Sequence, residues 1–174
     1  MNRIDLDFTL NGERISKSDV PGDMKLVDFL QEELGLTGTK FCCGIAVCRA
    51  CTVSVVRAEG GHQEAIRSCT TPVSDIRGHF VTTVEGLESD AGELHSLQQA
   101  FLDNFSFQCG YCCPGFLMAS YALLDKLRRQ PIPAEKVDEA IENAVGQHVC
   151  RCTGYVRYHR AIRQVLMETP GLVT

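Results

Sequence analysis

The sequence lacks the features that mark several common classes of protein. It has no run approaching the ~20 apolar residues that a membrane-spanning helix needs. Residues 1–7 alternate charged and apolar side chains, so they form neither an apolar signal-peptide core nor a twin-arginine motif. The sequence has few basic residues relative to acidic ones, 17 against 22, and its formal net charge is −5. We therefore expect no transmembrane segment in this chain, no nucleic-acid partner and, by default, a cytoplasmic location.

The sequence also lacks the side-chain sets of a self-contained enzyme. It contains no recognisable Ser–His–Asp set, no paired catalytic carboxylates and no glycine-rich phosphate loop. Internal repeats and low-complexity tracts are absent as well. The sequence therefore predicts no catalytic residues in this chain, and any substrate chemistry would belong to a partner.

Cysteine, in contrast, is abundant, with ten cysteines in 174 residues. Disulfides would suit an exported protein, but no export signal is visible and the chain is long enough to bury a core without them. Scattered buried thiols would be isolated along the chain, whereas these cysteines are clustered. Structural zinc is the rival to iron–sulfur clusters, and the spacing of the cysteines has to decide between them.

The first group of cysteines lies in a glycine-bearing segment. Cys43, Cys48 and Cys51 form a C-x4-C-x2-C triple, and Cys69 follows after seventeen residues. This spacing is typical of plant-type [2Fe–2S] sites, where a long loop directs backbone N–H groups at the sulfurs. Zinc sites more often use two short cysteine pairs, so the spacing favours iron. Cys43 is predicted as the ligand rather than its neighbour Cys42, because only Cys43 gives the four-residue gap.

The second group of cysteines comes from two distant segments. Cys109 and Cys112 form a C-x2-C pair, and Cys150 and Cys152 form a C-x-C pair. The first pair alone could be half of a zinc site or a redox dithiol, but its combination with a C-x-C pair is more specific. Four thiolates from these segments would hold the second half of the chain together. Cys113 and Cys42 are not assigned as ligands, and we expect both to be packing residues.

The pattern of apolar residues divides the chain into two halves. Strands are predicted at residues 3–10, 51–56 and 80–84, with a hairpin turn at 11–12. Helices are predicted at residues 25–34, 94–105, 114–129, 134–147 and 158–168. We therefore predict an α+β fold with a sheet domain at residues 1–84, a linker at 85–93 and a helical domain at 94–174.

The cysteine groups and their flanking residues resemble the small [2Fe–2S] subunit, or N-terminal iron–sulfur region, of the xanthine oxidase family of molybdenum hydroxylases. Aldehyde and isoquinoline oxidoreductases are members of this family. The matching stretches are residues 38–44 with Cys48, 50–53, 67–69, 108–112 with 114–116, and 150–155. They follow one another in the family's order and cover nearly the whole chain.

The resemblance implies a fold and a ligand set for each half of the chain. An N-terminal β-grasp, plant-type ferredoxin-like domain would hold one [2Fe–2S] cluster through Cys43, Cys48, Cys51 and Cys69. A C-terminal four-helix bundle would hold the other through Cys109, Cys112, Cys150 and Cys152. Gln108 and Cys152 would approach the molybdopterin cofactor of a large catalytic subunit.

The resemblance also implies an electron-transfer function. Electrons would pass from molybdopterin to the helical-domain cluster, then to the plant-type cluster, and then to an external acceptor such as a cytochrome c or an FAD subunit. The partner would oxidise an aldehyde or an N-heterocycle, with water as the oxygen source. Export with such a partner would place the chain in the periplasm or at a membrane. The alternatives are a free-standing two-cluster ferredoxin and a zinc-stapled structural adaptor.

The chain departs from the usual residues of this family at several positions, and relatives often have Gly near Ala46 and Val47. Relatives usually have Gly where this chain has Cys42 and Arg49, and Thr where it has Cys113. Glycine permits positive φ, so Arg49 bears directly on the conformation of the loop. We expect the Arg49 charge to favour the more negative, reduced cluster and to raise its potential, and Arg151 to offset charge at the other. The five histidines match no ligand position, which leaves them surface or supporting roles.

Overall fold

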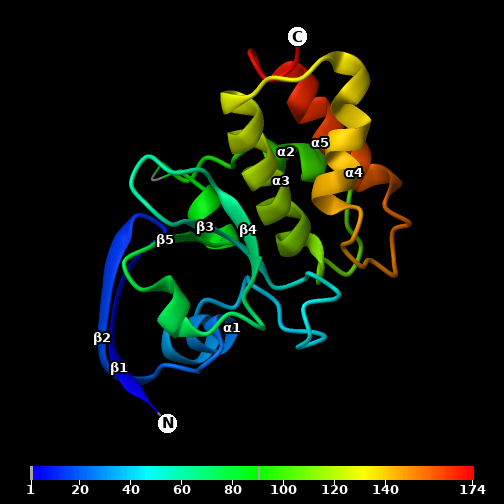
Figure 1. The fold of residues 1–174 in the computed structure, drawn as a ribbon. Helices are drawn as coiled ribbons and strands as arrows, with labels where there is room; N and C mark the ends of the chain where they lie inside the picture. The colour runs from blue at the N-terminus through cyan, green and yellow to red at the C-terminus, as the bar shows by residue number, and fades with distance from the viewer. Residues whose placement is uncertain (1, 90) are drawn as a thin grey trace.

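A mixed sheet occupies one end of the molecule and a group of helices occupies the other (Figure 1). The computed structural model describes residues 2–89 and 91–174. The strands are β1 (Arg3–Leu10), β2 (Glu13–Pro21), β3 (Thr52–Val56), β4 (Glu64–Arg67) and β5 (Phe80–Thr82). Their order is β2-β1-β5-β3-β4, in which β1 and β5 run parallel and the other neighbours antiparallel. The predicted α+β class is therefore confirmed.

The first two strands form the predicted hairpin. Asn11 and Gly12 both have positive φ, 51° and 87°, which is the conformation that a two-residue turn between right-twisted strands requires. Alternation along β1 then buries Leu6, Phe8 and Leu10 on one face. These side chains form the core of the sheet end, together with buried residues of the segment that follows β2.

That segment contains one short helical stretch instead of a regular ten-residue helix. Three residues form α1 (Leu26–Asp28), and the chain continues as a π-helical turn, η1 (Phe29–Glu33). Four apolar side chains on it, Leu26, Val27, Phe29 and Leu30, are fully buried. Gly35, with a φ of 68°, lies just beyond its end, as predicted.

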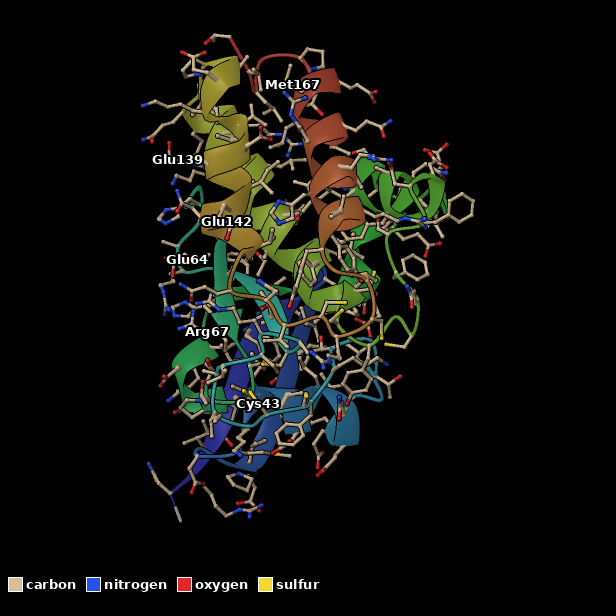
Figure 2. The ribbon with its side chains drawn as sticks, turned by 90° about the vertical axis from the view of Figure 1, so that its right-hand side faces the viewer. Cys43, Glu64, Arg67, Glu139, Glu142 and Met167 are labelled. Carbon is tan, nitrogen blue, oxygen red and sulfur yellow. The ribbon has the colours of Figure 1, made fainter. Side chains whose placement is uncertain are left out.

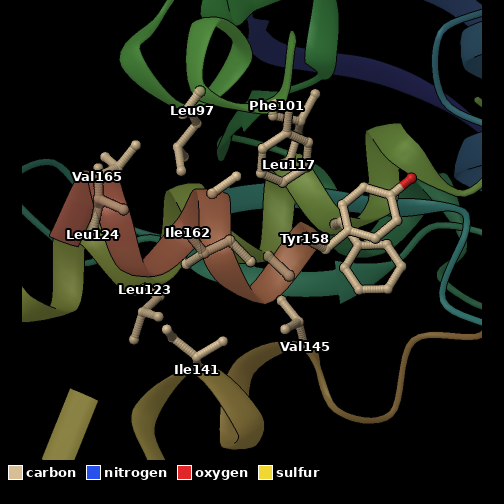
Figure 3. Packing of buried hydrophobic residues seen from close by; sticks show 14 of the residues in the cluster. Leu97, Phe101, Leu117, Leu123, Leu124, Ile141, Val145, Tyr158, Ile162 and Val165 are labelled. Carbon is tan, nitrogen blue, oxygen red and sulfur yellow. The ribbon is translucent and has the colours of Figure 1, made fainter. Parts of the chain in front are cut away.

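The helical end consists of α2 (Ser96–Asp103), α3 (Cys113–Arg129), α4 (Val137–Val145) and α5 (Val156–Glu168). Short 3₁₀ turns occur at η2 (Val73–Ile76), η3 (Val84–Leu87) and η4 (Ala134–Lys136). The helices surround a second core that is rich in leucine, isoleucine and valine (Figure 3). None of the helices in the described ranges is long and apolar enough to cross a membrane.

Helix α3 joins the two ends, because it packs against β3 as well as against α4. Its first turn lies directly on the cysteine-bearing loop of the sheet end. A Cβ atom at Gly115 would come within 2.4 Å of the Arg49 carbonyl oxygen and 3.1 Å of the Ala50 Cα atom. Only glycine allows this approach without moving one of the two backbones.

Candidate iron–sulfur sites

All ten cysteines are free thiols. Eight of them lie in pairs, which are Cys43–Cys48, Cys51–Cys69, Cys109–Cys152 and Cys112–Cys150. The Cys43–Cys48 pair lies on the loop before β3. Figure 2 shows Cys43 on the sheet side of the molecule, far from Met167 in α5. The Cys48 backbone N–H donates to Cys43 Sγ at 3.4 Å, and the N–H groups of Ile45 and Val47 also point at this sulfur. These donors lower the pKa of the Cys43 thiol to about 6, so they stabilise a thiolate there.

The loop reaches this shape through backbone conformations that glycine usually supplies. Gly44 has a φ of 68°, but Ala46 and Arg49 also adopt positive values, 60° and 61°. Arg49 therefore occupies the left-handed region in spite of its side chain. Its guanidinium donates to Gln147 Oε1, a contact with the segment before α5 that supports the strained residue.

The second pair of the first group is buried. Cys51 and Cys69 pack against each other and Val27, and each cysteine is 1% exposed. Burial raises the pKa of Cys51 to about 12. The Ser68 backbone N–H and hydroxyl both donate to the Cys51 carbonyl, which joins the two cysteine-bearing segments.

The second group also contains one buried pair and one more accessible pair, whereas Cys43 and Cys48 of the first group are half-buried. Cys109 Sγ and Cys152 Sγ lie 3.5 Å apart, and both residues are exposed. Cys112 and Cys150 are buried neighbours, and burial raises the pKa of Cys112 to about 11. The Thr153 hydroxyl lies 3.0 Å from Cys150 Sγ.

The pairing bears on which metal group the thiols fit. Within residues 2–89 and 91–174, no three Cys, His, Asp or Glu side chains converge as ligands of a single ion. Each group instead offers two thiol pairs, and a [2Fe–2S] cluster needs two thiolates on each of its two irons. A tetrahedral zinc site would draw its four ligands to one point. The arrangement therefore fits a dinuclear cluster at each group.

The two spare thiols lie beside these pairs in different surroundings. Cys42 is exposed, which differs from the packing role that the sequence predicted for it. Cys113, in the first turn of α3, packs against the helical core. Burial raises the pKa of Cys113 to about 12, so this thiol keeps its proton at neutral pH.

A direct link connects the two groups. The Val149 backbone N–H donates to the Cys48 carbonyl oxygen at 3.1 Å, and Val149 precedes Cys150 in the chain. Beside it, Thr52 Oγ1 lies 3.3 Å from His148 Nε2. One hydrogen bond therefore connects a cysteine of the first group to the neighbour of a cysteine of the second.

Two buried residues of these sites were missed by the reasoning from sequence. His148 is 3% exposed, and burial lowers its pKa to about 4, so its ring is neutral at pH 7. Tyr158, in α5, is fully buried with its hydroxyl 3.6 Å from Cys112 Sγ. Neither residue belongs to a spacing motif, because tertiary packing alone brings it to a cysteine group.

The residues predicted to face a partner, Gln108 and Cys152, lie at the surface. Arg151, which was predicted to offset the charge of the cluster, is exposed between Cys150 and Cys152. Exposed apolar side chains lie close in sequence to each cysteine of the Cys109–Cys152 pair. Phe105, four residues before Cys109, is 73% exposed, and Val156, four residues after Cys152, is 65% exposed.

Two family models match the chain in succession. A 2Fe-2S iron–sulfur cluster binding domain matches residues 8–74, and a [2Fe-2S] binding domain matches residues 83–163. The first match includes the cysteine group at 43–69, and the second includes the group at 109–152. The chain therefore contains two [2Fe–2S]-binding domains.

Known proteins are similar over most of the chain. It is 40% identical to isoquinoline 1-oxidoreductase subunit alpha of Brevundimonas diminuta, over 94% of this chain and 98% of that one. It is 37% identical to aldehyde oxidase 2 of Rattus norvegicus over 96% of this chain, but it spans only 12% of that enzyme's length. The crystal structure of quinoline 2-oxidoreductase from Pseudomonas putida 86 aligns with a TM-score of 0.78 at 31% identity, over 99% of this chain and 94% of that one.

The two consecutive [2Fe–2S] domains, the full-length match to a separate subunit and the shared fold agree with one another. The chain therefore belongs to the [2Fe–2S] iron–sulfur subunits of the xanthine oxidase family of oxidoreductases.

Proposed function

We propose that this chain is the electron-transfer subunit of a molybdenum-dependent dehydrogenase. It would relay electrons from a large molybdopterin-binding subunit to an external acceptor. The observation that carries the proposal is the hydrogen bond from the Val149 N–H to the Cys48 carbonyl, since it joins the two thiol groups through a few bonds. Such a link holds the two thiol groups close together, as a chain of redox centres requires.

The proposed ligands are the eight paired thiols. Cys43, Cys48, Cys51 and Cys69 would bind one cluster in a β-grasp, plant-type ferredoxin-like domain. Cys109, Cys112, Cys150 and Cys152 would bind the other in a four-helix bundle. Each cluster, when bound, accepts and releases one electron.

The chain's own residues would hold and insulate this charge. The backbone N–H groups that point at Cys43 stabilise its thiolate, as its lowered pKa indicates. The buried pairs, including Cys51 and Cys112, keep water from one side of each site. The half-buried Cys43–Cys48 pair and the exposed Cys109–Cys152 pair lie on the more accessible side of each site, which suits a relay that must receive and deliver electrons.

The entry side of the relay would be the exposed surface at Cys152. Gln108 and Cys152 would face the molybdopterin, and the exposed apolar side chains of Phe105 and Val156 would be covered by the large subunit. That subunit would oxidise an aldehyde or an N-heterocycle, in keeping with the names of the relatives. A cytochrome c or an FAD subunit would accept the electrons. The location would be cytoplasmic, or periplasmic if the complex is exported.

The ligand assignment is tested by a matched pair of serine variants. Cys43→Ser should lose the low-temperature EPR signal of the first cluster, whereas Cys42→Ser, one residue away, should keep both signals. Wild-type protein should contain about four irons with acid-labile sulfide. Zinc without sulfide would reject both clusters and favour the structural adaptor.

The functional assignment is tested by isolation from native cells. A large molybdenum-containing chain should co-purify in a fixed ratio, and the complex should reduce a dye acceptor when an aldehyde or N-heterocycle is supplied. A solitary two-cluster monomer that exchanges electrons with several enzymes would contradict the proposal and identify a free ferredoxin.

A further inference from the structure

The Tyr158 hydroxyl lies inside the protein against a cysteine sulfur. The residue is in the first turn of α5 and is 0% exposed, and its hydroxyl oxygen is 3.6 Å from Cys112 Sγ. A buried hydroxyl without a hydrogen-bond partner loses its hydration without compensation, so the position of this group requires a partner. The sulfur of Cys112 supplies one.

Aromatic contacts hold the phenol ring in this position. The Tyr158 ring stacks on Phe116, with centroids 4.2 Å apart and planes within 2°, and it tilts against Phe101 at 5.2 Å. Figure 3 shows its hydroxyl oxygen directed away from the aliphatic side chains of the core. The ring cannot swing its hydroxyl elsewhere without breaking the stack, so the direction of the oxygen is set by packing.

The direction of the hydrogen bond follows from the chemistry of the ligand. A cysteine bound to iron is a thiolate and has no proton to give, so the hydroxyl has to donate. An accepted hydrogen bond stabilises negative charge on the sulfur, and it does so more strongly when the cluster holds the extra electron. Hydrogen bonds to cluster sulfurs are one of the factors that set reduction potentials.

We propose that Tyr158 donates a hydrogen bond to the Cys112 thiolate and thereby raises the reduction potential of the helical-domain cluster. The inference rests on the proposed ligand set, in which Cys112 binds iron. It identifies Tyr158 as a positioning residue that acts through the ligand sulfur. The other cluster has no comparable contact with this hydroxyl among the described hydrogen bonds, so the effect should be confined to one cluster.

The test is an EPR-monitored reductive titration of the Tyr158→Phe holoprotein. The phenylalanine keeps the stacked ring and removes only the donor. We expect the equilibrium constant for reduction of the helical-domain cluster to fall about tenfold, which corresponds to about 59 mV for one electron. The signal of the first cluster should titrate at its wild-type potential and serves as an internal control.

Tyr121→Phe is the matched control, because Tyr121 is another tyrosine of the helical domain and its ring contacts His95, not a cysteine. Both clusters of the Tyr121→Phe protein should have the same reduction potentials as in the wild type. An unchanged or raised potential in Tyr158→Phe would overturn the proposal. Should that variant fail to assemble, Tyr158→Leu lacks the donor as well and should show the same fall.

Failure of the ligand assignment gives a different result. If Cys112→Ser keeps the helical-domain signal at its wild-type potential and line shape, Cys112 does not bind iron and both proposals about this cluster are wrong. If Cys112→Ser loses or changes the signal while Tyr158→Phe leaves the potential unmoved, only the role of Tyr158 is wrong.

Discussion

Substitution of Gly115 by alanine should show how firmly the two halves of the molecule are joined. The added Cβ would lie 2.4 Å from the Arg49 carbonyl oxygen, whereas ordinary contact distances exceed 3.4 Å, so a backbone must move by about 1 Å. Overpacking of this kind costs roughly 1–3 kcal/mol, and a rigid backbone neighbour favours the upper value. Alanine also favours the helix by up to about 1 kcal/mol over glycine. The net loss in the free energy of unfolding should be about 2 kcal/mol.

The assay is thermal unfolding of the holoprotein, followed by circular dichroism and by the visible absorption of the clusters. For a chain of this size the expected loss lowers the midpoint by about 4–8 °C. Gly78→Ala is the control, because Gly78 has a φ of 70° but no heavy atom lies within 4 Å of the position that a Cβ would take, so it tests conformational strain alone at about 1 kcal/mol. A Gly115→Ala protein as stable as the wild type would refute the close packing of α3 on the loop.

Three further predictions concern stability. Burial lowers the pKa of His95, whose Nδ1 accepts the N–H of Leu97 at the start of α2. The unfolded chain takes up a proton near pH 6.5 and the folded chain resists it, so stability should fall as the pH drops below about 6.5. His95→Asn should flatten this dependence in urea unfolding between pH 7 and pH 5. Asp125→Ala removes the acceptor of the Gln63 N–H, at 2.9 Å, and should cost about 1–2 kcal/mol, whereas Asp138→Ala, which breaks an exposed ion pair, should cost under about 0.5 kcal/mol in the same assay. Removal of iron with a chelator under reducing conditions should lower the urea midpoint further than any of these substitutions, because metal-binding energy contributes to folding, and an unchanged midpoint would contradict bound clusters.

Local patterns were sufficient to predict much of the fold. Strict alternation defined β1, and the residues at 11–12 indicated its hairpin, because both signals depend on neighbouring residues alone. Strand β4 was missed, since Glu64–Arg67 has little apolar character on either face. The strand predicted at 80–84 ends at Thr82, because Val84 turns away to pack against the helical core. The domain boundaries at 84 and 93 stay a prediction.

The helix predicted at residues 25–34 shows a different limit. Its apolar spacing was interpreted correctly, yet only Leu26–Asp28 is α-helical and the rest is a π-helical turn. The sequence contains no signal for this change, because it depends on how Phe29 and Leu30 fit beneath the sheet. Tertiary packing determined the local geometry here.

The candidate sites divide in the same way. Spacing along the chain identified both cysteine groups, and the two family models include the same segments. Spacing could not indicate which thiols pair or which are buried, since Cys112 meets Cys150 only after α3 and the last loop have docked. The positions of Tyr158 and His148 near the cysteine groups could not be predicted from spacing for the same reason.

The hydrogen bond between Val149 and Cys48 has a consequence for the rate of electron transfer between the two sites. Domains joined by a flexible linker move relative to each other by default, and electron tunnelling slows steeply as the gap between centres widens. Here the Val149–Cys48 hydrogen bond is one of several contacts across the junction, together with the packing of α3 on the loop and the Arg49–Gln147 hydrogen bond. The gap is therefore held constant by the fold, and transfer between the sites should proceed at one uniform rate instead of waiting for the domains to meet.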